Sequence, residues 1–193
     1  MKQYIFTLFL FLTVVFSSAA QADEHLKFRG IPIEGKTPEF VSKLCDQGFS
    51  VQVSDDKFAL LYGTFTGRNA RIFVSSTTVS HSVYRLLVQF DKVSTWHELV
   101  TLYDYYVSQY IRKYGTPQQQ VGQFLAPYAS GDGRELQALH DGKAVFGTRF
   151  VSDLGTVSII IDKTSDAVSI SYEDAAQLRI YDKEKAEIDL DEI

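Results

Sequence analysis

The residues best suited to chemistry gather in one short polar segment, Gly131-Asp132-Gly133-Arg134-Glu135. Two carboxylates on a glycine-rich loop can hold a cation or accept from a sugar hydroxyl. The same pattern is typical of a turn that needs positive φ, because glycine adopts that backbone without steric cost. We favour the turn, and keep Asp132 and Glu135 as candidate ligand-binding residues.

A hydrolase is the alternative function, with an acid and a base drawn from Asp132, Glu135 and His140. Catalytic groups are recognised by their arrangement in space, so distance along the chain does not exclude such a site. The sequence has no G-x-S-x-G elbow, no H-E-x-x-H and no phosphate-binding glycine loop. The catalytic residues stay unassigned, and an enzyme is the less favoured interpretation.

Metal and thiol chemistry have little support in the sequence. The four histidines show no metal-ligand spacing, and Cys45 is the single cysteine. We therefore predict no metal site, no cofactor and no intramolecular disulfide. Cys45 follows Leu44 in an apolar helical pattern, so we expect it to be buried and unreactive.

Tyrosines give the best hint of binding, because their rings stack on sugars and anchor protein partners. Most tyrosines between residues 103 and 114 fall on the apolar side of a predicted helix, where a role in the core is expected. Tyr105 alone falls on the opposite side. We keep it as a third candidate ligand-binding residue.

Helix signals define the elements that position these residues. Thr37-Pro38 starts a short helix over 38–47, which ends at Gly48. Thr95 and Glu98 have capping-box spacing and predict a long helix over 95–114. Its apolar stripe comprises Trp96, Leu99, Val100, Tyr103, Tyr106, Val107, Tyr110, Ile111 and Tyr114. A last helix is predicted over 175–186, followed by an acidic tail.

Strand patterns fill the rest of the chain. Strands are predicted over 58–66, 70–75, 82–90, 155–162 and 167–172, with a weaker one over 51–53. The stretch 118–133 is expected to be irregular. Asp141-Gly142 is a typical hairpin turn, which predicts two further strands over 135–140 and 143–151.

The order of helix and then strands occurs twice along the chain. Strand runs with segregated helices favour an α+β fold with antiparallel sheet, the helices packing on one face. We expect a single domain over 23–193, with a helix and acidic tail over 175–193. Similar halves over 23–93 and 94–174, formed as tandem helix-plus-strands units, are a further hypothesis.

The first 22 residues have the pattern of a secretory signal peptide. Lys2 precedes an apolar run over 5–16, and Ala20-Gln21-Ala22 fits a cleavage site before Asp23. The expected location is therefore the periplasm or the outside of the cell. The chain has a net charge of −5, which disfavours nucleic acid as a partner. The sequence has no second long apolar run, so we expect no integral membrane segment after the signal peptide.

Several fragments together resemble a group of small secreted proteins of unknown function from Bacteroides-type gut bacteria. They are His25-Leu26-Lys27-Phe28 with Gly30-Ile31-Pro32-Ile33, Lys113-Tyr114-Gly115 with Pro117, Gly131-Asp132-Gly133 with Glu135-Leu136-Gln137-Ala138-Leu139, and Val168-Ser169-Ile170-Ser171-Tyr172-Glu173-Asp174. The resemblance implies an extracytoplasmic setting and transfers no catalytic residue. The expected function is a soluble, non-catalytic binding module for an envelope protein or a glycan.

Overall fold

The computed structural model describes residues 25–191. The predicted signal peptide and its cleavage point between Ala22 and Asp23 lie outside these residues. The described part forms an eight-stranded sheet of order β3-β4-β5-β6-β10-β9-β8-β7, a two-stranded β1-β2 ribbon and four helices. The elements are β1 (Lys27–Phe28), β2 (Ile31–Pro32), α1 (Thr37–Asp46), β3 (Ser50–Ser54), β4 (Phe58–Phe65), β5 (Arg68–Ser76), β6 (Val83–Phe90), α2 (Trp96–Tyr114), β7 (Gln119–Phe124), α3 (Glu135–His140), β8 (Ala144–Ser152), β9 (Gly155–Asp162), β10 (Ala167–Asp174) and α4 (Ala175–Asp191).

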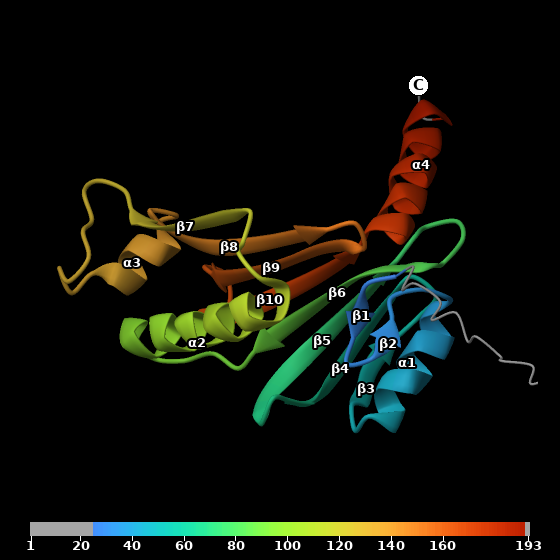
Figure 1. Ribbon diagram of the computed structural model, residues 1–193, viewed down its shortest axis with the longest axis horizontal. Coiled ribbons are helices and arrows are strands. Elements are labelled where there is room, and N and C mark those ends of the chain that lie inside the picture. Colours follow the sequence, from blue (N-terminus) through green and yellow to red (C-terminus); the bar gives the residue numbers. More distant parts are fainter. Residues whose placement is uncertain (1–24, 192–193) are drawn as a thin grey trace, which may run out of the picture.

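The predicted α+β class is confirmed, with every pairing in the sheet antiparallel. The sheet consists of two four-stranded meanders, β3 to β6 after α1 and β7 to β10 after α2. Their last strands pair with each other, Ile170 of β10 lying opposite Val88 of β6. Figure 1 shows the two halves side by side along this seam. Duplication as the origin of the layout stays a hypothesis.

Two adjacent rows across the sheet show that its faces differ. One row is buried on the six inner strands and comprises Leu61, Ile72, Val88, Ile170, Ile159 and Thr148. The next row is exposed or half-buried and comprises Leu60, Phe73, Leu87, Ser171, Ser158 and Arg149. The buried row lies under α1, α2 and the ribbon, all of which contribute to one core. We call the other side the open face.

Helix α2 covers the buried face of the second half (Figure 1). The predicted capping box is present, since Thr95 Oγ1 accepts from the Glu98 N–H and the Glu98 carboxylate accepts from the Thr95 N–H. The Tyr103 hydroxyl lies 2.6 Å from Thr148 Oγ1, which fastens the helix to β8. One detail of the predicted stripe is wrong, because Leu102 is buried and Ile111 is 40% exposed.

Helix α1 buries Phe40, Val41 and Leu44 against the first half of the sheet. The prediction that Cys45 is buried is wrong, since this residue is exposed. At about 100° per residue, Cys45 lies beyond Val41 at the margin of the apolar stripe. The sheet buries only the centre of the apolar stripe of this short helix, so residues at the margin of the stripe face solvent.

The predicted hairpin around Asp141-Gly142 is also wrong, because residues 135–140 form helix α3. Gly142 has φ +67, its N–H donates to Leu139 O, and the Lys143 N–H donates to Ala138 O. These bonds form a Schellman-type helix end, in which glycine takes the left-handed position. The Asp141-Gly142 pair therefore ends a helix, whose residues favour helix formation, instead of forming the turn of a hairpin.

Residues 119–124, predicted to be irregular, form the edge strand β7. This strand pairs with β8 over six residues, from Gln119 opposite Arg149 to Phe124 opposite Ala144. Three glutamines and a glycine hide its alternation, because an edge strand with little burial needs few apolar residues.

Helix α4 follows β10 directly and projects from the end of the sheet (Figure 1). The Glu184 carboxylate accepts from the N–H groups of Val79, at 2.7 Å, and Ser80, at 3.0 Å. Tyr181 stacks on Tyr84 with ring centroids 4.3 Å apart. These contacts hold the helix to the β5–β6 loop, and it continues to Asp191, beyond the predicted end at 186.

Candidate functional site

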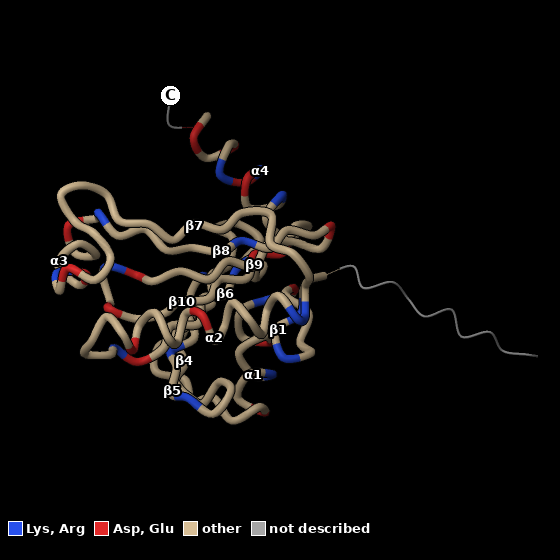
Figure 2. Tube along the Cα trace, turned by 60° about the vertical axis from the view of Figure 1, so that its left-hand side comes forward, with Lys and Arg blue, Asp and Glu red and all other residues tan. Residues whose placement is uncertain are grey.

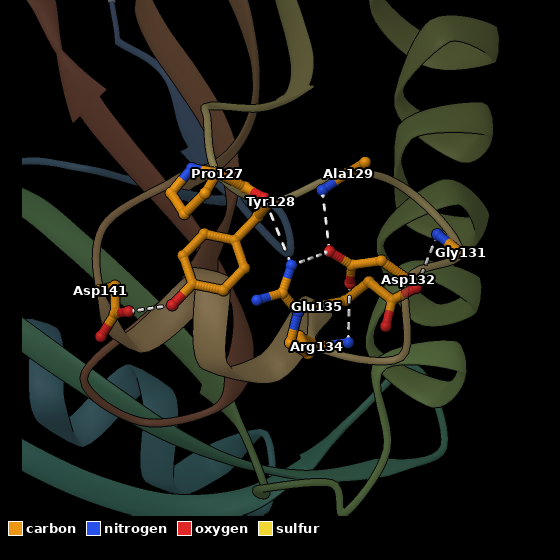
Figure 3. A network of polar contacts seen from close by, with 8 residues as sticks. All are labelled: Pro127, Tyr128, Ala129, Gly131, Asp132, Arg134, Glu135 and Asp141. Carbon is orange, nitrogen blue, oxygen red and sulfur yellow. Dashed lines mark hydrogen bonds and ion pairs between the residues drawn. The ribbon is translucent and has the colours of Figure 1, made fainter.

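The glycine-rich segment lies in the loop between β7 and α3, and its carboxylates are engaged within that loop (Figure 3). Asp132 accepts from the N–H groups of Ala129, at 3.0 Å, and Arg134, at 2.8 Å, and its carboxylate contacts the Arg134 guanidinium at 3.1 Å. These backbone donors, with the guanidinium, lower the pKa of Asp132. Gly131 and Gly133 have φ +80 and +76, as a turn requires.

Glu135 is similarly occupied, because its carboxylate accepts from the Gly131 N–H at 2.8 Å. The ring of Tyr128 lies under the Arg134 guanidinium, 5.0 Å from centroid to Cζ, and its hydroxyl donates to Asp141. Figure 3 shows these groups turned toward one another around the loop. The arrangement satisfies the loop's own polar atoms, which is the function of a structured turn.

His140 pairs with Asp166 at 2.5 Å instead of joining Asp132 and Glu135. Lys92 Nζ binds the other oxygen of Asp166 at 2.8 Å, and this ammonium lowers the pKa of the carboxyl. The Val93 N–H also donates to the Asp166 carbonyl. Asp166 thus ties the end of α3 and the β6–α2 loop to the β9–β10 turn.

Tyr105 is 48% exposed on the outer side of α2, where the sequence placed it. It lines a hollow of about 410 Å³ together with Arg68, Val93, His97, Glu98, Thr101 and Leu102. The Glu98 carboxylate in this lining accepts from the Thr95 N–H and hydroxyl in the helix cap, and Tyr105 lies edge-on to Tyr106 at 5.1 Å. The hollow therefore holds a histidine and a carboxylate, but that carboxylate is already occupied by the capping box.

Within residues 25–191, no group of three or more His, Cys, Asp or Glu side chains comes close enough to hold a metal ion. Every helix in this range is too short or too polar to cross a bilayer. Both signs of charge alternate along α4 in Figure 2.

The open face is a side of the sheet that α1, α2 and the ribbon leave uncovered. In its first half, Leu60, Phe73 and Leu87 lie side by side on neighbouring strands, and the exposed Arg71 lies on the same side. In its second half, Ser171 and Ser158 continue the same row, and the side chains of Val145, Val151 and Ile160 are exposed. The alternation of apolar and polar residues in β6 and β10 indicated from the sequence which of their side chains point outward.

No family model matches the chain, and neither a curated protein nor a solved structure matches it.

Proposed function

We propose that the chain is a non-catalytic binding module that acts outside the cytoplasm, and that the open face is its binding surface. One observation carries the proposal: α1, α2 and the ribbon cover one side of the sheet, while the side bearing Leu60, Phe73 and Leu87 carries half-buried apolar groups without such a cover. Exposed apolar patches rimmed by polar residues are typical of interaction sites.

The hydrolase alternative has less support. Asp132 and Glu135 accept hydrogen bonds from their own loop, and His140 is engaged with Asp166. A general acid or base needs a free, positioned group beside a pocket. Alanine at Asp132 or Glu135 should therefore leave any activity of the protein unchanged, whereas loss of a hydrolytic activity in either variant would restore the alternative.

Photo-crosslinking in the cells that make the protein tests the binding surface. A photoreactive phenylalanine analogue replaces Phe73 on the open face or, as the matched control, Tyr105 on the outer side of α2. We expect one reproducible crosslinked product from position 73 and none from position 105. Equal products from both positions, or none from either, would contradict the proposal.

The extracytoplasmic location follows from the signal-peptide pattern of residues 1–22. N-terminal sequencing of the native protein tests it. We expect the chain to begin near Asp23, and a chain that keeps Met1 in a cytosolic fraction would contradict the location.

A further inference from the structure

The open face carries arginines that lack acidic partners, although the whole chain has a net charge of −5. Arg71 and Arg149 are exposed there and have no carboxylate partner among residues 25–191. The carboxylates on the strands of this side are Glu173, paired with Arg85 at 3.5 Å, and Asp162, which accepts from the Thr164 and Ser165 hydroxyl groups. Three arginines therefore lie on this side of the described strands against two carboxylates, a small excess of positive charge.

A buried polar atom beneath this face, Ser169 Oγ, has no hydrogen-bond partner, and its residue is only 1% exposed. Ser169 lies opposite Gln89 on β6 and Ile160 on β9, at the centre of the sheet. Native structures leave few buried polar atoms unsatisfied, so this hydroxyl marks a place on the sheet where hydrogen bonding is incomplete.

A hollow of about 220 Å³ lies beside one of the unpaired arginines. It is lined by Gln119, Val121, Gly147, Thr148, Arg149, Ser158 and Ile160. Gly147 leaves room here, since a Cβ on this residue would lie 3.6 Å from Ile160 and 3.8 Å from Val121. The space suits one side chain whose end meets the Arg149 guanidinium.

Apolar anchors occupy the other half of the face. Phe73 lies between Leu60 and Leu87, and its ring centroid is 6.2 Å from that of Phe58. Tyr62, 38% exposed, and Val53, 54% exposed, extend the patch toward β3. Aromatic residues and arginine are the groups most enriched at the centres of protein interfaces.

We propose that the open face binds a segment of a partner protein that combines carboxylates with aromatic or aliphatic side chains. This inference rests on the proposed function. A carboxylate pairs with a guanidinium in a bidentate way, which supplies the anion that Arg149 and Arg71 lack. An acidic glycan offers the anion without apolar anchors. A second copy of this chain, bound through the same face, would bring its own unpaired arginines and would not supply the missing anion.

The test uses a library of random 12-residue peptides displayed on phage and selected on the purified protein. We expect enrichment of peptides that contain Asp or Glu together with Phe, Trp or Leu. One enriched peptide, labelled for fluorescence anisotropy, is then titrated against the wild type and variants whose melting temperatures match it. Its affinity should fall as salt is raised.

The variants distinguish the open face from the rest of the surface. Arg149→Glu and Arg71→Glu should each weaken binding by about tenfold, and Gly147→Val should weaken it by filling the hollow. Arg68→Glu is the matched control, because Arg68 is an exposed arginine on the same strand as Arg71 but on the other side of the sheet. Its affinity should stay within about twofold of the wild type.

Several results would overturn the inference. They are a lack of enriched peptides, enrichment without acidic residues, equal weakening by Arg68→Glu, tighter binding of an acidic glycan than of any selected peptide, or a dimer in solution that Phe73→Asp dissociates. A crosslink from position 73 to a partner segment without carboxylates would overturn it while leaving the proposed function intact. A failure of the crosslinking itself removes the proposed function.

Discussion

His25 Nδ1 lies 3.1 Å from Asp174 Oδ1, which connects the first described residue to the last residue of β10. The Asp174 side chain is fully buried and also accepts from the N–H groups of Leu26, at 2.7 Å, and Gln177, at 2.9 Å. On its other side, His25 Nε2 contacts Glu34 at 3.3 Å. One carboxylate therefore caps α4 and fastens the N-terminal segment to it.

Replacement of this carboxylate should destabilise the protein strongly. We expect Asp174→Ala to lower the free energy of unfolding by about 3 kcal/mol, because two N–H groups would lose their acceptor in a buried site. Asp153→Ala, at an exposed turn, should stay within about 0.5 kcal/mol of the wild type. Urea denaturation measures both, and similar midpoints would show that the cap contributes little.

A charge placed on the inner side of α2 should unfold the protein, whereas a charge on its outer side should not. Tyr110 is 8% exposed and Tyr105 is 48% exposed on the same helix. An unpaired buried charge costs several kcal/mol. The Tyr110→Asp variant should therefore be largely unfolded near physiological temperature and show no cooperative melting transition. Tyr105→Asp is the matched control and should melt nearly as the wild type does. Circular dichroism on heating distinguishes the two.

Buried tyrosines should make the fold sensitive to alkali. Burial raises the pKa of Tyr110 and Tyr172, whose hydroxyl groups contact each other. Tyrosine in an unfolded chain titrates near pH ~10. Because the folded pKa is higher, the stabilisation is complete below that pH and is lost as pH rises above it.

The melting temperature should therefore fall above about pH 10. The double variant Tyr110→Phe, Tyr172→Phe should show a shallower fall, since it lacks these two phenols. Melting curves between neutral and alkaline pH provide the measurement. Identical slopes for the variant and the wild type would assign the alkaline effect to other groups.

Gly155 should not tolerate alanine. A Cβ there would lie 2.1 Å from the Glu173 carbonyl oxygen, and the residue has φ +148. We expect Gly155→Ala to lower the unfolding free energy by about 3 kcal/mol, as overpacking and backbone strain combine. Gly147→Ala is the control, because its Cβ would have ordinary contacts. Stability to urea should separate the two variants clearly.

Cys45 should react in the folded protein, since it is exposed on α1. A maleimide reagent should label the native chain as fully as the denatured chain, and Cys45→Ser should change stability by less than about 0.5 kcal/mol. Mass spectrometry measures the extent of labelling. Protection of the native thiol would mean that another surface covers this side of α1.

Local signals predicted the elements whose stabilising contacts are also local. The Thr95–Glu98 capping box places the start of α2 within one residue, and the alternation of Val168, Ile170 and Tyr172 identifies the buried side of β10. Asp141-Gly142 failed as a signal because a left-handed glycine serves both a hairpin and a helix end. Only the bonds from Gly142 and Lys143 back to α3 distinguish the two.

The candidate site was less accessible to sequence reasoning. The turn expected around Asp132 is present, whereas Glu135 begins α3 instead of the predicted strand. The open face depends on the register of distant strands. Phe73 and Ser171 belong to one row because β6 pairs with both β5 and β10. No local pattern reports that pairing, since the strands are separated by α2 and half of the chain.

The β6–β10 seam also has a consequence for folding on the ribosome. When the first half emerges, β6 is the last strand of its meander and its outer edge has no partner until β10 is made. Non-local pairing of this kind slows folding, and an unpaired edge is prone to join other chains. A chain whose first half folds before β10 is made therefore exposes the outer edge of β6 as a template for pairing with other chains, and synthesis of the last strand ends that stage.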